Sequence, residues 1–156
     1  DDQGRHRHVE VSDRSGKGDW TMDVAGYFGK LARLGEETTV TDGTGAPLSL
    51  DDGIARLVGL FGALPGSGNK AMIAGNGGSA AIASHFATDF TKNGGVPSLA
   101  FTDAALLTCL SNDYGYEHVY SKQIEAFAKP GDLVVLISSS GTSANIVAAA
   151  QAALVA

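Results

Sequence analysis

Two patterns of hydrophobic positions divide the chain at Pro65. Before this residue, apolar side chains recur every three or four positions in two segments, and this spacing predicts two amphipathic helices. The first helix is expected to take Thr21 as its N-cap, and its apolar face comprises Val24, Tyr27, Phe28, Leu31 and Leu34. A capping signal formed by Ser49 and Asp52 precedes the second helix, whose apolar face comprises Ile54, Leu57, Val58, Phe61 and Leu64. The stretch 41–49 is predicted to be a loop.

After Pro65, short and almost continuous apolar runs alternate with helical segments. The apolar runs predict buried strands at 70–74, 98–102 and 133–138. The segments between and after them predict helices at 79–91, 104–110, 119–128 and 144–155. This alternation is typical of a three-layer α/β fold, a parallel sheet with helices on both faces. Ligands of such folds bind outside the carboxyl ends of the strands.

Composition narrows the class of protein. The chain has 156 residues, of which 44% are apolar and 18% are charged, and this suits one globular domain rather than a membrane protein. The net charge is −6 and the basic residues are scattered outside a short run at 4–8, so we expect no nucleic-acid partner. A single cysteine, Cys109, excludes an internal disulfide and is expected to be buried. No signal peptide is recognisable, which predicts a cytoplasmic protein. Residues 1–20 are polar and aperiodic, and are predicted to be a flexible tail.

Two loops at the ends of predicted strands are candidates for anion binding. "GNGGSA" at 75–80 combines glycines that allow close backbone approach with the N-terminus of a helix, where free N–H groups favour an anion. "SSSGTS" at 138–143 offers rotatable hydroxyl donors before another helix. The alternatives are a glycine turn needed only for packing and a serine-rich N-cap. Asn112 and Asp113 are expected in a break after the second strand, where they either line the same rim or simply form a turn.

A histidine and an aspartate share one face of the helix that follows the first loop. His85 and Asp89 are four residues apart, so they can converge on one ligand or one metal ion. Ile82, Phe86 and Phe90 are predicted to pack this helix on the sheet, which would place the pair at the border of the core. The alternative is an ordinary helix pair, because two ligands are fewer than the three that a catalytic zinc usually takes.

Three segments, in this order and spacing, resemble one protein family. "GNGGSAAIASHFATDF", "LLTCLSNDYGYEHVYSKQIEAFAKPGD" and "VLISSSGTSANIVAAAQAA" are similar to the sugar isomerase (SIS) domain of the phosphoheptose isomerases, which convert sedoheptulose 7-phosphate to D-glycero-D-manno-heptose 7-phosphate. The resemblance covers about 70–154 and implies a flavodoxin-like α/β fold. It assigns 21–156 to a partial SIS domain, with N-terminal helices at 21–64 and the sheet with its flanking helices at 70–156. It also implies a cytoplasmic homotetramer with sites at subunit interfaces.

The resemblance implies roles for individual residues. The positions that match the family's substrate and phosphate contacts are Asn76, Gly77, Gly78, Ser79, Asn112, Asp113, Ser138, Ser139, Ser140 and Ser143. His85 matches a zinc ligand of those members that bind metal, and Asp89 stands where the family has a glutamate that is both metal ligand and acid–base catalyst. The family continues through two further strands and a helix whose glutamine and histidine complete this set. The chain is therefore expected to be a truncated SIS domain that holds half of the catalytic site.

Two other functions compete with a phosphosugar isomerase. One is a non-catalytic SIS module that binds a sugar phosphate or a partner protein, as the DnaA initiator-associating protein does within the same superfamily. The other is a dinucleotide-binding domain, because "GNGGSA" also fits G-x-G-x-x-A and Asp103 lies where a ribose-binding acid would fall. This second alternative gives no role to the loop at 138–143.

Overall fold

The computed structural model describes residues 10–11, 20–21 and 23–156. The chain divides into two compact units, 1–53 and 54–156, and each is considered by itself. Most of the predicted tail at 1–20 lies outside the described residues. Within it, β1 (Glu10–Val11) pairs antiparallel with β2 (Trp20–Thr21). The three-stranded parallel sheet belongs to the second unit, so the candidate site lies in that unit.

Besides the β1–β2 pair, the described part of the first unit contains an exposed helix and a second antiparallel strand pair. Helix α1 (Val24–Glu37) begins after Asp23, whose carboxylate accepts a hydrogen bond from the amide of Gly26 at 3.0 Å. Thr21 belongs to β2, so the predicted N-cap was wrong by two residues. Strands β3 (Val40–Thr41) and β4 (Pro47–Leu48) pair antiparallel, and all of this hairpin except Val40 falls in the segment predicted to be a loop. All five residues of the apolar face of α1 are exposed, by 45% to 64%.

Helix α2 and the elements after it follow the predicted order. Helix α2 (Leu50–Gly62) is capped as expected, because Ser49 Oγ accepts from the Asp52 amide at 3.0 Å and donates to the Asp52 carboxylate at 2.6 Å. The elements that follow are β5 (Ala71–Gly75), α3 (Gly78–Lys92), β6 (Ser98–Ala100), α4 (Ala104–Tyr114), η1 (Tyr116–His118), α5 (Ser121–Phe127), β7 (Leu133–Ile137) and α6 (Ala144–Ala153).

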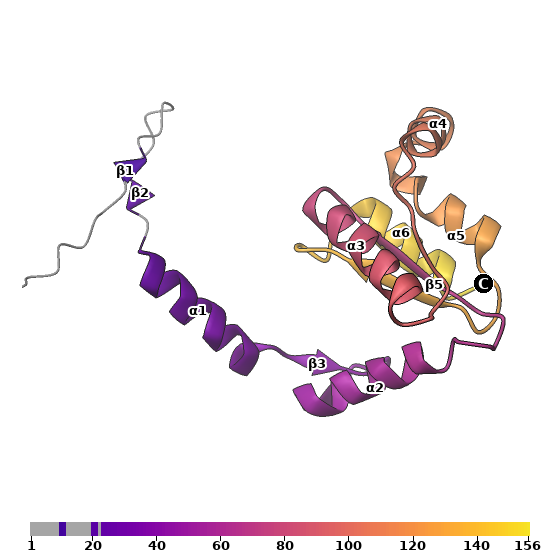
Figure 1. Ribbon diagram of the computed structural model, residues 1–156. Coiled ribbons are helices and arrows are strands. Elements are labelled where there is room, and N and C mark those ends of the chain that lie inside the picture. Colours follow the sequence, from indigo (N-terminus) through magenta and orange to yellow (C-terminus); the bar gives the residue numbers. More distant parts are fainter. Residues whose placement is uncertain (1–9, 12–19, 22) are drawn as a thin grey trace, which may run out of the picture. The chain divides into compact units, whose positions relative to one another are not determined.

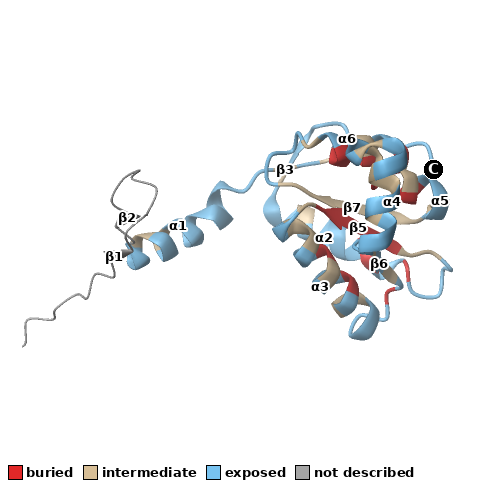
Figure 2. Ribbon diagram, turned by 90° about the horizontal axis from the view of Figure 1, so that it is seen from above, coloured by how far each residue is buried: buried red, intermediate tan, exposed pale blue. Residues whose placement is uncertain are grey.

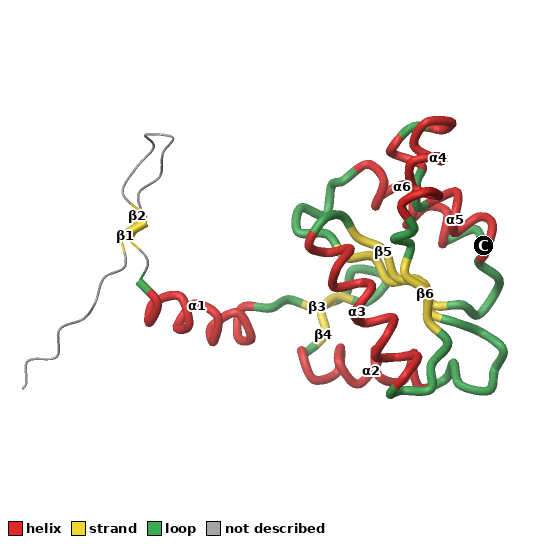
Figure 3. Tube along the Cα trace, turned by 45° about the horizontal axis from the view of Figure 1, so that its top comes forward, coloured by secondary structure: helices red, strands yellow, loops and turns green. Residues whose placement is uncertain are grey.

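The three strands of the second unit form a parallel sheet in the order β6-β5-β7. The central strand β5 is fully buried, and successive side chains point to opposite faces. Met72 and Ala74 belong to a core cluster with Ile124, Ile146 and other residues of α5 and α6. Ala71 and Ile73 belong to clusters with residues of α2 and α3. Figures 1 and 3 show the resulting layers, and Figure 2 shows the buried residues concentrated in and beside the sheet. The predicted three-layer α/β fold is confirmed.

The clearest error of prediction concerns the segment after β6. Helix α4 does not stop at Leu110 but continues to Tyr114, and Gly115 ends it with a φ of 88°, a conformation that favours glycine. The predicted helix at 119–128 corresponds to the shorter α5, and η1 lies just before the predicted range. Asn112 and Asp113 therefore lie in the last turn of α4 instead of in a break. None of the described helices is long and apolar enough to cross a membrane.

The buried carboxylate of Asp132 links the residues that lead into β5 and β7. The side chain of Asp132 is 1% exposed and lies 2.5 Å from Lys70 Nζ. It also accepts from the backbone amides of Lys70 at 2.9 Å and Lys129 at 3.0 Å. Burial acts to raise the pKa of this carboxyl, but the bonds from Lys70 and Lys129 outweigh burial, so the pKa lies below its ordinary value. The ionised form of Asp132 therefore stabilises the folded state.

Asp132→Asn is expected to lower the free energy of unfolding at neutral pH by about 1–3 kcal/mol, because it removes a charge-assisted bond inside the protein. Since the pKa is lower in the folded state, the wild type gains this stability above the unfolded-state value of about 3.9. The gain disappears as the pH falls through the lower, folded-state pKa. Urea unfolding of both proteins from pH 7 to pH 3 measures the difference. A difference that stays constant over this range would contradict the assignment.

Candidate functional site

The structure brings the two candidate loops to the same edge of the sheet. Gly75, the last residue of β5, pairs with Ile137, the last residue of the adjacent strand β7. Asn76 and Ser138 follow these two residues directly, and α3 and α6 begin a few residues further on. Two loops and two helix N-termini therefore converge at the carboxyl end of the sheet, which is the position where ligands of α/β folds bind.

The glycine loop is shaped by close packing between strand and helix. A Cβ added to Gly75 would lie 2.7 Å from Ser79 Cβ and 2.8 Å from its carbonyl carbon, so no larger residue fits at Gly75 without a shift. Gly77 is the N-cap residue of α3 and has a φ of 53°, and no side chain caps the helix there. The Ser79 amide returns to the carbonyl of Asn76 at 2.9 Å. Packing thus explains Gly75, whereas the uncapped start of α3 is open to an anion.

The serine loop is held by its own hydroxyls. Ser138 Oγ accepts from the Gly141 amide at 3.1 Å, and Ser140 Oγ accepts from the Thr142 amide at 3.2 Å. Ser143 occupies the N-cap position of α6, but its side chain makes no capping bond. It lies instead 3.5 Å from Ser140 Oγ. A serine-rich N-cap therefore does not account for this loop, whose hydroxyl groups gather at the start of α6.

A partly buried amide pair that sequence reasoning missed links the glycine loop to the helix that follows the serine loop. Asn76 Nδ2 donates to Asn145 Oδ1 at 2.9 Å, and Asn145 Nδ2 donates to Asn76 Oδ1 at 2.8 Å. Asn145 lies in the first turn of α6 and is 3% exposed. Tyr116 and Tyr120 add their hydroxyls to the Asn76 side, at 3.1 Å and 3.4 Å from Oδ1. The signal in the sequence was an asparagine two residues after the serine loop, in the first turn of a helix with small apolar residues.

The pair predicted on α3 is formed, but it lies in a different environment from the one expected. His85 Nε2 is 3.3 Å from Asp89 Oδ2, with the side chains 75% and 48% exposed. The expectation that the pair borders the core was wrong, because Ala83 and Ala87 form the buried face of α3. Ile82 and Phe86, predicted to pack on the sheet, are 47% and 45% exposed. Asn93 Nδ2 also donates to Asp89 Oδ1 at 3.3 Å, so both carboxylate oxygens have a partner.

The other predicted site residues are separate from these loops. Asn112 Nδ2 donates to Asp113 Oδ1 at 2.9 Å, and the Cys109 thiol lies 3.7 Å from Asp113 Oδ2. These bonds stay within α4, and none reaches the glycine or the serine loop. Cys109 is exposed, so its predicted burial was wrong. Asn112 and Asp113 are expected to face a substrate only if it extends from the loops toward α4.

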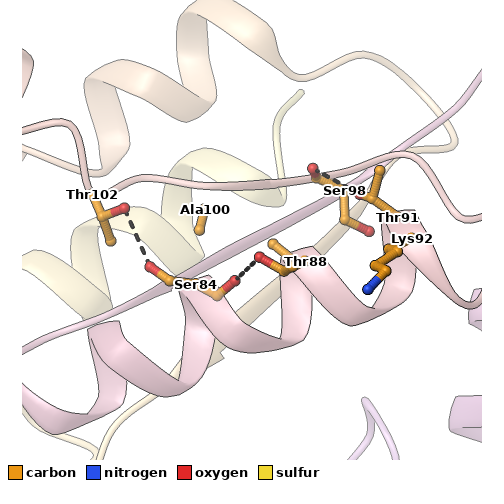
Figure 4. Close-up of a pocket in the computed structure, with 8 residues that line it drawn as sticks. Ser84, Thr88, Thr91, Lys92, Ser98, Ala100 and Thr102 are labelled. Atoms are coloured by element: carbon orange, nitrogen blue, oxygen red, sulfur yellow. Dashed lines mark hydrogen bonds between the residues drawn. The ribbon is translucent and has the colours of Figure 1, made fainter.

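A shallow hollow of about 470 Å³ lies between α3 and the edge strand β6, away from both loops. Hydroxyl side chains of α3 line it, together with Lys92 and residues of 98–102 (Figure 4). Ser84 Oγ lies 3.3 Å from Thr102 Oγ1, and Thr91 Oγ1 donates to the carbonyl of Ser98 at 3.4 Å. These bonds hold α3 against the edge strand of the sheet. The hydroxyl protons of Ser84 and Thr91 are donated to other groups of the protein.

The fold and the paired loops define a class of protein, a three-layer α/β domain in which a glycine loop and a serine loop meet at the carboxyl ends of two adjacent parallel strands. Residues 48–155 match the family model described as "SIS domain", so the chain belongs to the SIS domain family. This family match favours the SIS interpretation over a dinucleotide-binding domain. In addition, the carboxylate of Asp103 accepts from the Leu106 amide at 2.7 Å as the N-cap of α4.

The chain is similar in sequence to several phosphoheptose isomerases. That of Roseiflexus sp. (strain RS-1) is 49% identical over 92 residues, which cover 55% of this chain and 47% of that protein. That of Geotalea daltonii is 46% identical over 99 residues, which cover 60% and 52%. The chain thus spans about half the length of the curated relatives it matches. Phosphoheptose isomerase GmhA from Neisseria gonorrhoeae has a similar structure, with a TM-score of 0.71 and 36% identity over 84% of this chain and 67% of that one.

Proposed function

We propose that the protein containing this chain is a phosphosugar aldose–ketose isomerase that converts sedoheptulose 7-phosphate to D-glycero-D-manno-heptose 7-phosphate. The observation that carries the proposal is the placement of a glycine loop and a serine loop side by side, with a histidine–carboxylate pair on the helix that leaves the first loop. The names of the relatives that match it support the same activity.

The loops would bind the phosphorylated end of the sugar. Ser138, Ser139, Ser140 and Ser143 surround the start of α6, where hydroxyl and amide donors favour a phosphate. Gly77, Gly78 and Ser79 would approach the sugar through backbone amides and one hydroxyl, and Asn76 through its amide. Binding the phosphate away from the reacting carbons would orient those carbons and contribute to rate.

Asp89 is the proposed acid–base catalyst. Isomerisation moves a proton from C1 of the ketose to C2, while a second proton moves from the hydroxyl on C1 to the carbonyl oxygen on C2. The carboxylate of Asp89 would take the proton from C1 and return it to C2 of the enediol. His85, 3.3 Å away, would orient this carboxylate. It would also transfer the hydroxyl proton from the oxygen on C1 to the oxygen on C2.

Zinc is a proposed cofactor to which this chain would contribute two ligands. His85 and Asp89 are suitable donors at helical spacing, but no group of three His, Cys, Asp or Glu side chains occurs among the described residues. Protein zinc sites take three or four ligands. The residues therefore fit part of a zinc site, and further ligands would have to come from elsewhere in the protein or from another subunit. A bound zinc ion would polarise the oxygens on C1 and C2.

The distance along α3 favours a site built from two copies of the chain. Asp89 follows Gly77 by twelve residues, which is about 18 Å along the helix axis. An extended seven-carbon sugar phosphate is shorter than this, so a substrate held by the loops of one chain would not reach Asp89 of the same chain. The exposed residues Ile82 and Phe86 flank His85, and the apolar face of α1 is also exposed. We therefore propose a homo-oligomer, with a tetramer as the expected form.

Two inactive variants of the complete protein are expected to restore activity when they are unfolded together and refolded as a mixture. Asp89→Ala would remove the catalyst from every subunit, and Ser138→Ala would weaken phosphate binding. A mixed oligomer contains sites with both residues intact, if each site uses loops from one subunit and Asp89 from another. The refolded mixture should isomerise the substrate at roughly one tenth of the wild-type rate or more. This value reflects the random mixing of the two kinds of subunit in each oligomer.

The control adds Phe28→Glu, which places a charge on the apolar face of α1, to both variants. If α1 supports the assembly, this change should lower the oligomeric state measured by light scattering and remove the recovery of activity. No recovery from the simple mixture, in the presence of mixed oligomers shown by mass spectrometry, would refute the shared site.

The alternative function is a non-catalytic SIS module that binds a sugar phosphate or a partner protein. The high exposure of His85 and the lack of a third metal ligand among the described residues favour it. Proton NMR of the complete protein with sedoheptulose 7-phosphate, with and without added zinc, separates the two functions. Appearance of the aldose signals supports the isomerase. Binding without turnover in both conditions would overturn the isomerase and favour the module.

A further inference from the structure

The Asn76–Asn145 pair fixes the orientation of a proposed substrate residue. Each amide donates to the oxygen of the other, at 2.9 Å and 2.8 Å, so the two side chains form a closed pair. Asn76 belongs to the loop after β5, whereas Asn145 belongs to α6, directly after the serine loop. The pair is therefore a direct side-chain link between the glycine loop and the helix that follows the serine loop.

The hydrogen bonds around Asn76 leave only one proton of its side-chain amide free to bind a ligand. Its Oδ1 atom accepts from Asn145 Nδ2 at 2.8 Å and from the hydroxyl of Tyr116 at 3.1 Å. The Tyr120 hydroxyl is also 3.4 Å away, but its single proton goes to the shorter bond with the Gly75 carbonyl. A side-chain amide oxygen has two lone pairs, so this acceptor is saturated. Nδ2 carries two protons, and Asn145 Oδ1 takes one of them. The second proton has no acceptor among the described residues, so Asn76 can act on a ligand only as a donor.

Tyr120 holds the backbone at the base of the same loop. Its hydroxyl donates to the carbonyl of Gly75 at 2.5 Å, and the residue is 2% exposed. Burial, together with the neighbouring Tyr116, raises the pKa of this phenol above its ordinary value. Tyr120 therefore stays protonated at neutral pH and keeps its donor directed at the loop.

We propose that Asn145 and Tyr120 are positioning residues, which hold Asn76 so that a single N–H group points from the glycine loop toward an oxygen of the phosphosugar. This inference rests on the proposed function. Both residues lie outside the predicted loops, and together they would hold the glycine loop in place beside the serine loop. The oxygen that Asn76 meets must accept a hydrogen bond: a carbonyl, enediolate or phosphate oxygen, or a hydroxyl oxygen whose own proton is donated to another group.

A double-mutant cycle in the complete protein tests whether Asn145 acts through Asn76. Asn145→Ala alone should lower kcat/KM by roughly 10-fold to 100-fold, within the coupling range of residues in contact. In an Asn76→Ala background, the same change should lower kcat/KM by less than about threefold, since its target is already absent. Equal losses in both backgrounds would overturn the proposal, because Asn145 would then act independently of Asn76.

Gln123→Leu is a matched control for a purely structural effect. Gln123 is also a buried amide, 4% exposed, and its Nε2 donates to the carbonyl of Val119 at 2.7 Å, with no bond to either loop. The variant should lower Tm as Asn145→Ala does, but keep kcat/KM within about twofold of the wild type. If the control lost activity to the same degree at equal loss of Tm, a general loss of stability would explain Asn145→Ala.

A spectroscopic measurement separates failure of this inference from failure of the proposed function. In ¹⁵N-labelled protein, the Asn76 side-chain amide proton that bonds to Asn145 should exchange more slowly with solvent than a free amide proton does, and Asn145→Ala should remove this protection. If the wild type does not isomerise sedoheptulose 7-phosphate, the proposed function fails while this signal still tests the pair. If the wild type is active but the Asn76 signal does not respond to Asn145→Ala, the inference alone fails.

Discussion

Asp89→Ala should reduce kcat for sedoheptulose 7-phosphate isomerisation by about 10²-fold to 10⁴-fold, the usual contribution of a general acid–base catalyst. The carboxylate is half exposed and has His85 Nε2 at 3.3 Å from one oxygen and Asn93 Nδ2 at 3.3 Å from the other. It is not part of the core, so its removal should leave Tm nearly unchanged. Coupled kinetic assays on the complete protein, together with thermal unfolding, measure both effects.

Two variants show whether the loss is specific to this carboxylate. Asp89→Glu introduces the residue that the resemblance implies at this position and keeps the charge one methylene further out, so its activity should stay within about tenfold of the wild type. Glu125→Ala removes another exposed carboxylate, which pairs with Lys122 at 2.7 Å on α5, and should not change the rate. Normal turnover by Asp89→Ala would remove Asp89 from the mechanism.

Gly75→Ala should lower the free energy of unfolding by about 3 kcal/mol, at the upper end of the usual range for overpacking. The added methyl group would stand 2.7 Å to 2.9 Å from three atoms of Ser79, two of which are backbone atoms of α3 that cannot rotate away. Either the helix shifts or the strand ends earlier, and both displace the Asn76 loop. Urea unfolding should show a lower midpoint, and phosphosugar affinity should fall with it.

Gly59→Ala is the control for adding a methyl group in a helix without a collision. Gly59 lies inside α2, and a Cβ there would meet no atom within 4 Å. Because alanine is the better helix former, this variant should gain about 0.5–1 kcal/mol. Equal stability of the Gly75→Ala variant and the wild type would show that the β5–α3 junction is looser than the structure indicates.

Local patterns located the strands and most of the helices of the second unit. Apolar runs with turn residues on either side placed β5 and β7 within one residue, because a strand buried on both faces must be apolar throughout. The Ser49 cap of α2 was also predicted, because capping depends only on residues three positions apart. The end of α4 was missed because Asn112 and Asp113 are turn formers by local preference, whereas the helix continues until Gly115 adopts a positive φ.

The sequence by itself determined the fold class, the two loops and the i, i+4 spacing of His85 and Asp89, since all three depend on residues close together in the chain. Only the tertiary structure decided which side chains meet across the sheet edge. Asn76 and Asn145 are 69 positions apart and pair because β5 and β7 end side by side. It also decided that Ala83 and Ala87, rather than Ile82 and Phe86, face the sheet. Small residues allow a helix to lie close to a sheet, and hydrophobic spacing alone does not reveal which face approaches.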